Sequence, residues 1–410
     1  MLGVFRTIPR TSKDTLNRFK RNLVIFLFSL VFAVSNISQI PLISELGLSS
    51  AICIVAWLIL LAVTVVLSPN ILFLGKTKGV FVLSAVFILF LLFLTFAFGN
   101  RYFSSSVYSL FISLLALFLG IQITQFLKQK DISIIFLSYA ISAFVVAIIV
   151  YFDYFYGKVT LDSRIYAYDS KNSLSQILLS AIILIIFYIP SKKALIPIKL
   201  LACLFLLFLI VLMRSRATIL GIFVIAVALL FSKKTTLRFR ILLISALLVL
   251  FFFYIINPSL FNPIINNVLL AGRSISDLND LSSGRINIIK EGLILFNSNI
   301  FSGIGSYYLD CFPISALLQF GIFGGSILIL ISLSPIVSSI HLCFKKVNKT
   351  ISYCFLGFLL ISISYTLNGL FEGLTPFGPG VKCYLLWFML GFYSNYKENY
   401  SKQINELEQN

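Results

Sequence analysis

The sequence predicts an all-α, polytopic integral membrane protein with about 12 transmembrane helices and one large extracytoplasmic loop. Two compositional features support this: 59% of the 410 residues are hydrophobic and only 11% are charged, and the mean hydropathy is +1.03. A soluble domain of this length carries roughly twice that charged fraction. The third feature is a series of apolar runs, each of roughly 18 residues or more, along the whole chain. Each run is long enough to cross a bilayer as a helix.

The expected spans fall in two groups, on either side of a polar loop. Residues 1–256 hold transmembrane helices 1–9, residues 257–311 the extracytoplasmic loop, residues 312–396 transmembrane helices 10–12, and residues 397–410 a cytoplasmic tail. With edges good to a few residues, the spans are 22–40, 48–68, 79–99, 106–127, 132–155, 173–190, 194–213, 216–232, 239–256, 312–340, 350–371 and 379–396. Because many spans follow the basic segment Arg6 to Arg21, the first run is interpreted as a transmembrane helix and not as a cleaved signal peptide.

Lys and Arg set the expected orientation, because the cytoplasmic loops of membrane proteins are enriched in both. Placing both termini in the cytoplasm puts most of these residues inside, including the N-terminal segment and the cluster from Lys233 to Arg240. Topology then explains the net charge of +18, and no nucleic-acid partner is expected. The arginines left on the outer side, where the rule disfavours them, are Arg164, Arg214, Arg216, Arg273 and Arg285. Most carboxylates fall on the same side, so the outer face carries charged side chains of both signs, as a polar site would.

The stretch from Asn257 to Asp310 is the long polar interruption in the second half of the chain. A loop of this length between spans usually has a function of its own. A turn is expected at Ser282, Ser283 and Gly284, followed by a helix from Arg285 to about Phe296 whose apolar periodicity indicates an amphipathic helix on the membrane surface. A second turn is expected at Gly303-Ile304-Gly305.

The arginines are candidate phosphate ligands, because a guanidinium presents a planar fork of donors that fits phosphate oxygens. Arg214 and Arg216 flank Ser215 where one span ends and the next begins; the alternative is that they reach the lipid headgroups. Arg164 lies in the loop before Asn172 and Ser173, which are good helix N-cap residues. The alternative for Arg164 is a solvated pair with Asp162 or Asp169.

Carboxylates near the outer face are candidate acids or bases. Glu372 follows a span directly, and an ionisable group there is a functional candidate by default; the alternative is an exposed loop-tip charge. Asp277 and Asp280 resemble a metal-binding pair, but such pairs in flexible loops are more often solvated. The single histidine, His341, falls in a predicted cytoplasmic loop, and no His/Cys cluster is present. Neither a metal nor a cofactor is therefore expected.

Four sequence features follow one another along the chain. They are the Arg164 loop before Asn172, the Ser215–Arg216 pair opening a span, Ser283-Gly284-Arg285 followed by an apolar helix and Gly303-Ile304-Gly305, and the stretch from Leu318 to Gly324. Together they resemble the bacterial O-antigen polymerase and ligase superfamily, the Wzy-type polysaccharide polymerases. Their order and spacing carry the resemblance more than any one of them, and the resemblance covers most of the chain. The ligase branch has a histidine shortly before the last motif, where this chain has Asp310 and Cys311. The resemblance therefore favours a polymerase over a ligase.

The resemblance implies a multi-pass protein of the bacterial cytoplasmic membrane that joins oligosaccharide repeat units carried on undecaprenyl pyrophosphate, outside the membrane. Arg216 and Arg285 would hold the pyrophosphate and stabilise the departing charge, and Arg164 would be a third phosphate contact. Arg214, Asn172 and Arg273 would also bind substrate. Glu372, Asp310 or Glu291 would accept the proton of the attacking hydroxyl. The implied partners are the lipid-linked oligosaccharide, membrane lipid, a chain-length regulator and a flippase.

Three other functions stay open at this point. A ligase would transfer finished glycan to a lipid core. A lipid-linked sugar flippase would have a similar number of spans, but transporters often contain internal repeats, and none is evident here. A channel or scaffold would not need so many arginines on the outer face.

Overall fold

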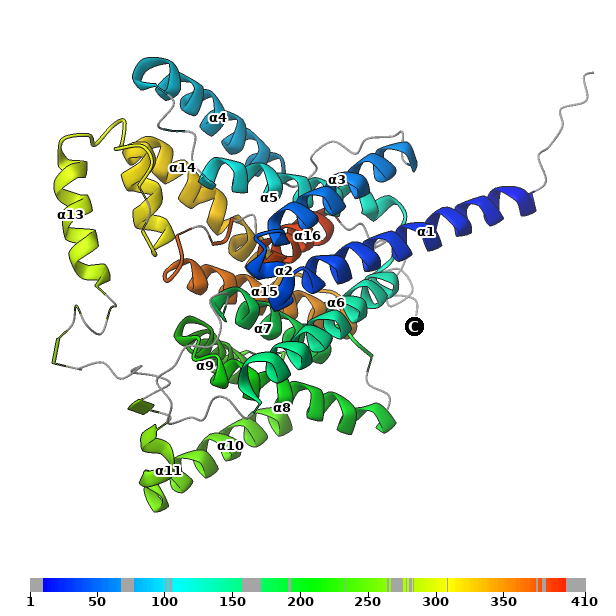
Figure 1. Ribbon diagram of the computed structural model, residues 1–410. Coiled ribbons are helices and arrows are strands. Elements are labelled where there is room, and N and C mark those ends of the chain that lie inside the picture. The colour runs from blue at the N-terminus through cyan, green and yellow to red at the C-terminus, as the bar shows by residue number, and fades with distance from the viewer. Residues whose placement is uncertain are drawn as a thin grey trace, which may run out of the picture.

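The computed structural model describes residues 10–67, 77–99, 102, 105–156, 171–190, 193–232, 234–263, 265–266, 276–277, 279, 282, 284–307, 309–373, 375–377 and 381–395. These form an all-α bundle (Figure 1). The helices are α1 (Arg10–Ile37), α2 (Pro41–Glu45), α3 (Ser49–Leu67), α4 (Lys78–Phe98), α5 (Ser105–Gln122), α6 (Gln129–Val150), α7 (Lys171–Phe187), α8 (Ile196–Leu212), α9 (Arg216–Phe231), α10 (Leu237–Ile256), α11 (Pro258–Pro263), α13 (Arg285–Asn297), α14 (Phe312–Cys343), α15 (Lys349–Gly369) and α16 (Val381–Asn395).

The predicted spans coincide with helices α1, α3 to α10 and α14 to α16. In the described part of the chain, 8 helices are long and apolar enough to cross a membrane, and α7 and α9 are shorter apolar helices. A π-helical turn, Tyr151–Phe155, extends α6. The protein is thus an all-α polytopic membrane protein, as predicted.

Helix α16 runs through the centre of the bundle (Figure 1). Its residues 383–394 are all buried, as expected for a helix that is apolar on every side. Tyr384 stacks on Trp57 of α3 with ring centroids 4.5 Å apart, and Trp387 stacks on Phe377 at 5.3 Å. The second contact attaches the segment after α15 to the core. This segment includes Glu372.

Helix α14 is broken, which the apolar run alone does not predict. Gly321 has φ 70° and ψ −178°, a backbone conformation open essentially to glycine alone. The break separates a short segment, 312–320, from residues 322–343. The longer segment would be about 33 Å long, enough on its own to cross the roughly 30 Å hydrocarbon core. The short segment therefore need not lie at the middle of the bilayer.

The turn after α13 satisfies the backbone groups that the break exposes. The N–H groups of Ile304 and Gly305 donate to the carbonyls of Leu318 (2.8 Å) and Gln319 (3.1 Å), and Ile322 N–H donates to the Ile300 carbonyl (2.8 Å). Buried helix ends need such partners. The turn packs so closely against the break that no side chain fits at Gly321, since a Cβ there would lie 2.0 Å from the Phe301 carbonyl oxygen. The predicted Gly303–Gly305 turn is therefore the support of the broken helix.

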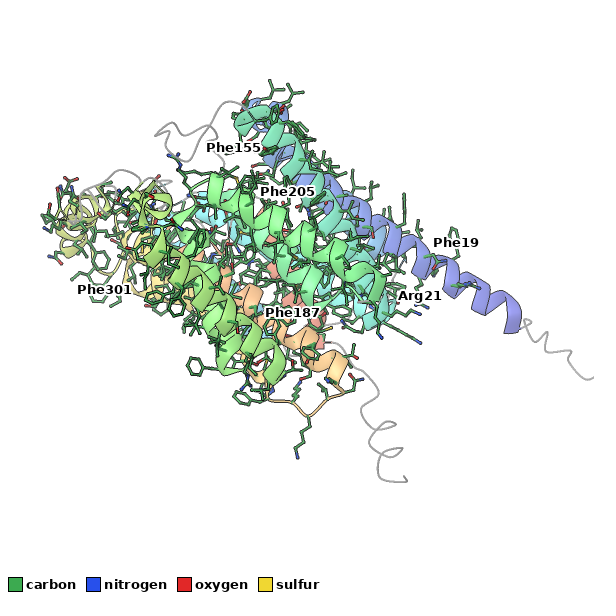
Figure 2. All side chains as sticks on the ribbon, turned by 90° about the horizontal axis from the view of Figure 1, so that it is seen from below. Phe19, Arg21, Phe155, Phe187, Phe205 and Phe301 are labelled. Carbon is green, nitrogen blue, oxygen red and sulfur yellow. The ribbon has the colours of Figure 1, made fainter. Side chains whose placement is uncertain are left out.

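Helix α13 lies at the edge of the molecule, apart from the main bundle (Figure 1). It extends over the residues predicted for it and touches α14 where Gly292 lies close to Leu318 and Tyr307. Ile294 and Leu295 are largely exposed. Phe301, just after α13, marks the edge of the molecule opposite Arg21 (Figure 2). The position of α13 on a membrane surface stays a prediction.

Candidate functional site

Arg285 is the first residue of α13, and the turn before it fixes where the helix starts. Gly284 adopts a left-handed conformation (φ 77°), and its N–H donates to the Asn279 carbonyl at 2.8 Å. Two N–H groups of the first helical turn also find side-chain acceptors. Ile286 N–H donates to Ser282 Oγ (3.3 Å) and Asn287 N–H to Asn279 Oδ1 (3.2 Å). The predicted turn is thus found at Ser282 and Gly284. It caps the start of α13 and thereby fixes the position of Arg285.

The Arg285 guanidinium joins three parts of the chain. Its Nη2 donates to Asp310 Oδ2 at 3.1 Å and to the Phe371 carbonyl at 3.2 Å. Asp310 precedes α14 and Phe371 follows α15. An arginine has five N–H donors, and these contacts use the two on Nη2. Its Nε is buried and has no partner among the described residues. The side chain is 24% exposed, and because Nε is buried, the exposed part lies elsewhere on the side chain.

Glu372 lies directly after the carbonyl that Arg285 contacts. The Phe371 N–H donates to the Asn368 carbonyl at 2.9 Å, which continues the last turn of α15. On the other side of Glu372, Trp387 Nε1 donates to the Pro376 carbonyl at 3.0 Å. The chain is therefore held on both sides of Glu372, beside Arg285.

A second polar cluster forms where α8 ends and α9 begins. Arg214 is 5% exposed and adopts φ 56°, an uncommon conformation for a residue with a side chain. Ser215 is fully buried, and its Oγ donates to Asn172 Oδ1 at 3.1 Å. Because that bond uses the only hydroxyl proton of Ser215, Thr218 donates to Ser215 in the 2.9 Å contact between them. Arg216 is the first residue of α9.

The predicted N-cap role of Asn172 is wrong. Helix α7 begins at Lys171, so Asn172 lies inside the first turn. Its side-chain oxygen accepts from Ser215 of the neighbouring segment and not from the start of its own helix. Asn172 therefore connects α7 to the junction that carries Arg214 and Arg216.

Hydrogen bonds between α7 and α15 connect the helix that carries Asn172 to the segment that Arg285 contacts. Gln176, one turn along α7 from Asn172, donates through Nε2 to Ser364 Oγ at 2.8 Å. Gln176 Oε1 accepts from Asn368 Nδ2 at 3.3 Å, and the Asn368 carbonyl accepts from Phe371. Asn368 is 1% exposed, and its Oδ1 has no partner among the described residues. This network thus joins α7 to the end of α15, where the Phe371 carbonyl accepts from Arg285.

We expect Gln176→Ala to lower the thermal unfolding midpoint by several degrees. The substitution removes two hydrogen bonds and leaves the buried polar groups of Ser364 and Asn368 unsatisfied, each at about 1–3 kcal/mol. Asn297→Ala, at an exposed position at the end of α13, is the control and should leave the midpoint unchanged. Equal midpoints for the two variants would show that the network does not stabilise the protein.

Several predicted site residues are not placed together by the structure. Arg164, Arg273 and Asp280 lie outside the described residues. Glu291 is exposed on α13, and Asp277 Oδ1 accepts from Asn279 N–H at 2.8 Å in an exposed turn. His341 lies at the C-terminal end of α14, far along that helix from Asp310. Within the described residues, no three His, Cys, Asp or Glu side chains could hold a metal ion together.

Cys311 lies next to Asp310, at the start of α14. Burial raises the pKa of its thiol, and this outweighs the opposing effects of a backbone hydrogen bond from Ile314 and of the nearby Arg285 charge. A thiol with a raised pKa is a poor nucleophile at neutral pH. We therefore assign Cys311 no nucleophilic role.

One comparison with known proteins gives a match. Residues 201–329 match the family model described as O-antigen ligase. The matched region runs from α8 to α14 and contains Arg214, Arg216, Arg285 and Asp310. A search of curated proteins found no match. The resemblance predicted from the sequence motifs is confirmed in this region.

Proposed function

We propose that this chain, which carries the O-antigen ligase domain of the O-antigen polymerase and ligase superfamily in residues 201–329, is a polysaccharide polymerase. It joins oligosaccharide repeat units carried on undecaprenyl pyrophosphate at the outer face of the bacterial cytoplasmic membrane. Both termini then face the cytoplasm, and a flippase supplies the repeat units. The observation that carries the proposal is the incompletely satisfied guanidinium of Arg285.

A diphosphate ester is the ligand that suits this guanidinium. Two donors of Arg285 hold Asp310 and Phe371, while Nε is buried without a partner. Leaving a buried charged donor unpaired costs more than the roughly 1–3 kcal/mol of a neutral one. Phosphate oxygens would satisfy the donors of Nη1 through charge-assisted bonds. Arg216 and Arg214, from the second cluster, would add positive charge for the second phosphate.

The reaction exchanges one bond at the anomeric carbon for another. A hydroxyl oxygen of one repeat unit attacks the anomeric carbon of a second, and a glycosidic C–O bond forms. The bond from that carbon to the pyrophosphate oxygen breaks, and its electron pair leaves with undecaprenyl pyrophosphate. Arg285 and Arg216 stabilise the negative charge that develops there. Since the donor is already activated, the step requires no nucleotide.

Glu372 is the carboxylate that we assign as proton acceptor. Asp310 holds Arg285 and therefore has a positioning role, and Glu291 is exposed on α13. Glu372 adjoins the carbonyl that Arg285 contacts.

We expect Glu372→Gln to lower the transfer rate by about 100-fold, the lower range for a lost general base. The measurement is the initial transfer rate at matched amounts of folded protein. Glu291→Gln is the matched control and should keep the wild-type rate. A wild-type rate in Glu372→Gln would exclude Glu372 as the base.

A ligase is the second candidate, because the matching family model is described as O-antigen ligase. Against it, the chain has one histidine, His341, and it lies at the other end of α14 from Asp310 and Cys311. The chain therefore offers no imidazole at the position where the ligase branch is expected to have one.

A flippase is less well supported. The break at Gly321 is a broken helix of the kind that transporters use. Its exposed backbone groups are satisfied by the turn from Ile300 to Gly305, and residues 322–343 can span the membrane without the short segment. The break therefore serves to hold α13 and Arg285 in place.

Deletion of the chromosomal gene, with separation of lipid-linked and surface glycans on a gel, distinguishes these functions. We expect the deletion strain to carry single repeat units on the final carrier, and the wild-type gene to restore long chains. Long chains that accumulate on undecaprenyl pyrophosphate would instead identify a ligase. Repeat units that stay on the cytoplasmic side would identify a flippase.

A further inference from the structure

A basic cavity lies between α1 and α6, at the end of the bundle away from α13. It has a volume of about 800 Å³, and its charged residues are Arg18, Lys20, Arg21, Lys130 and Asp131. Arg21 and Phe301 lie on opposite sides of the molecule (Figure 2). The cavity is therefore separate from the candidate site around Arg285.

The one carboxylate of this cavity is fully engaged. Arg21 Nε donates to Asp131 Oδ2 at 2.9 Å, and Arg21 Nη2 donates to Asp131 Oδ1. The Lys128 N–H also donates to Oδ2, at 2.8 Å. Asp131 is buried, so this pair cross-links α1 to α6 and neutralises Arg21. Among the described residues, Arg18, Lys20 and Lys130 form no ion pair with a carboxylate.

An apolar groove continues from the cavity along the same two helices. The groove has a volume of about 650 Å³ and shares Asn22, Ile25 and Ile134 with the cavity. On α1 it extends to Ile37, which corresponds to about 22 Å of helix. One leaflet of the hydrocarbon core is about 15 Å thick. The groove is thus long enough for an acyl chain that begins at the basic cavity.

A cavity with surplus positive charge that opens into an apolar groove matches one chemical class, a lipid with an anionic head and a long hydrocarbon chain. Basic pockets between transmembrane helices bind anionic lipid headgroups. We propose that the α1–α6 cavity and groove bind one anionic glycerophospholipid, with its phosphate among Lys20, Lys130 and Arg18 and an acyl chain along Ile25 to Ile37. Bulk lipid attracted by charge alone would not need the groove.

The test is native mass spectrometry of the full-length protein, with phosphatidylglycerol, phosphatidylcholine and inorganic phosphate as probes. We expect one phosphatidylglycerol to bind in preference to phosphatidylcholine, and inorganic phosphate not to displace it. The double variant Lys20→Gln/Lys130→Gln should bind phosphatidylglycerol roughly 30-fold more weakly, since each cation near the surface contributes about a factor of five. Lys346→Gln/Lys349→Gln removes the same charge elsewhere and should bind like wild type.

A second variant tests the groove without changing charge. Ala33→Trp fills the groove and should also weaken phosphatidylglycerol binding, whereas Ala62→Trp, on an exposed position of α3, should not. Wild-type binding in both pocket variants would overturn the proposal. Equal weakening in the Lys346/Lys349 control, or displacement by inorganic phosphate, would overturn it as well, because either result would mean that charge alone retains the lipid.

Discussion

Replacing Arg285 with alanine is expected to lower the rate of glycan transfer by about 10³-fold or more, the range seen when an arginine that stabilises charge on a transferring phosphate group is lost. The variant loses the donors proposed for the phosphates. It also releases Asp310 and the Phe371 carbonyl, which Arg285 Nη2 holds at 3.1 and 3.2 Å. The measurement is the initial rate with purified, reconstituted protein at matched protein amounts.

Arg285→Lys separates charge from geometry. Lysine keeps the positive charge but has a single nitrogen. That nitrogen cannot donate to Asp310 and the Phe371 carbonyl and at the same time offer two parallel donors to a phosphate. We therefore expect less than about a tenth of the wild-type rate. Lys290→Ala is the matched control, because it removes one positive charge from an exposed position of the same helix. A wild-type rate in Arg285→Lys would mean that a point charge suffices, and a wild-type rate in Arg285→Ala would remove Arg285 from the site.

Gly321→Ala is expected to be the most destabilising single substitution of those considered. The backbone conformation at Gly321 costs any other residue about 1–3 kcal/mol. The new Cβ would also lie 2.0 Å from the Phe301 carbonyl oxygen, so the turn after α13 must move, at a further cost of roughly 1–3 kcal/mol. We expect a large loss of folded protein, and loss of transfer in what remains, because the same turn positions α13 and Arg285. Folded yield and thermal midpoint in detergent measure this.

Two other glycines separate the cost of the backbone conformation from the cost of the Cβ contact. Gly99 has φ 89° and ψ −179°, nearly the conformation of Gly321, but no atom of the described residues lies within 4 Å of a Cβ built there. Gly99→Ala should show the backbone cost alone. Gly79 lies inside α4 without a positive φ, and no atom of the described residues lies within 4 Å of a Cβ there, so Gly79→Ala should be neutral or slightly stabilising. If Gly321→Ala is no worse than Gly99→Ala, the contact with Phe301 does not matter to the fold.

The helical spans could be predicted because their signal is local. A run of apolar residues long enough to cross a bilayer leaves little choice but a helix, since the backbone must satisfy its own hydrogen bonds there. The start of α13 was predictable for a similar reason, from a turn followed by apolar periodicity. The break in α14 was not, because Gly321 lies in a continuous apolar run. What fixes the break is the turn from Ile300 to Gly305, and that contact is tertiary.

The site was predicted in part. Arg285 and Asp310 were chosen separately from the sequence, and the structure brings them into contact. Gln176 and Asn368 were missed, although a signal exists: Asn172, Gln176 and Ser180 recur every four residues on one face of an apolar helix, as do Ser364 and Asn368. Polar residues with this spacing in a span point to the bundle interior. The role of Asn172 was misjudged because a helix boundary is uncertain by a few residues.

The measurement that tests the central claim most directly is chain growth by the purified wild-type protein in proteoliposomes. The reaction contains one substrate, a repeat unit on undecaprenyl pyrophosphate, without nucleotide sugar or lipid core. The account predicts products of two or more repeat units and release of undecaprenyl pyrophosphate, with both lost in Arg285→Ala. An intact donor in the presence of folded wild-type protein, or transfer only after a lipid core is added, would contradict it.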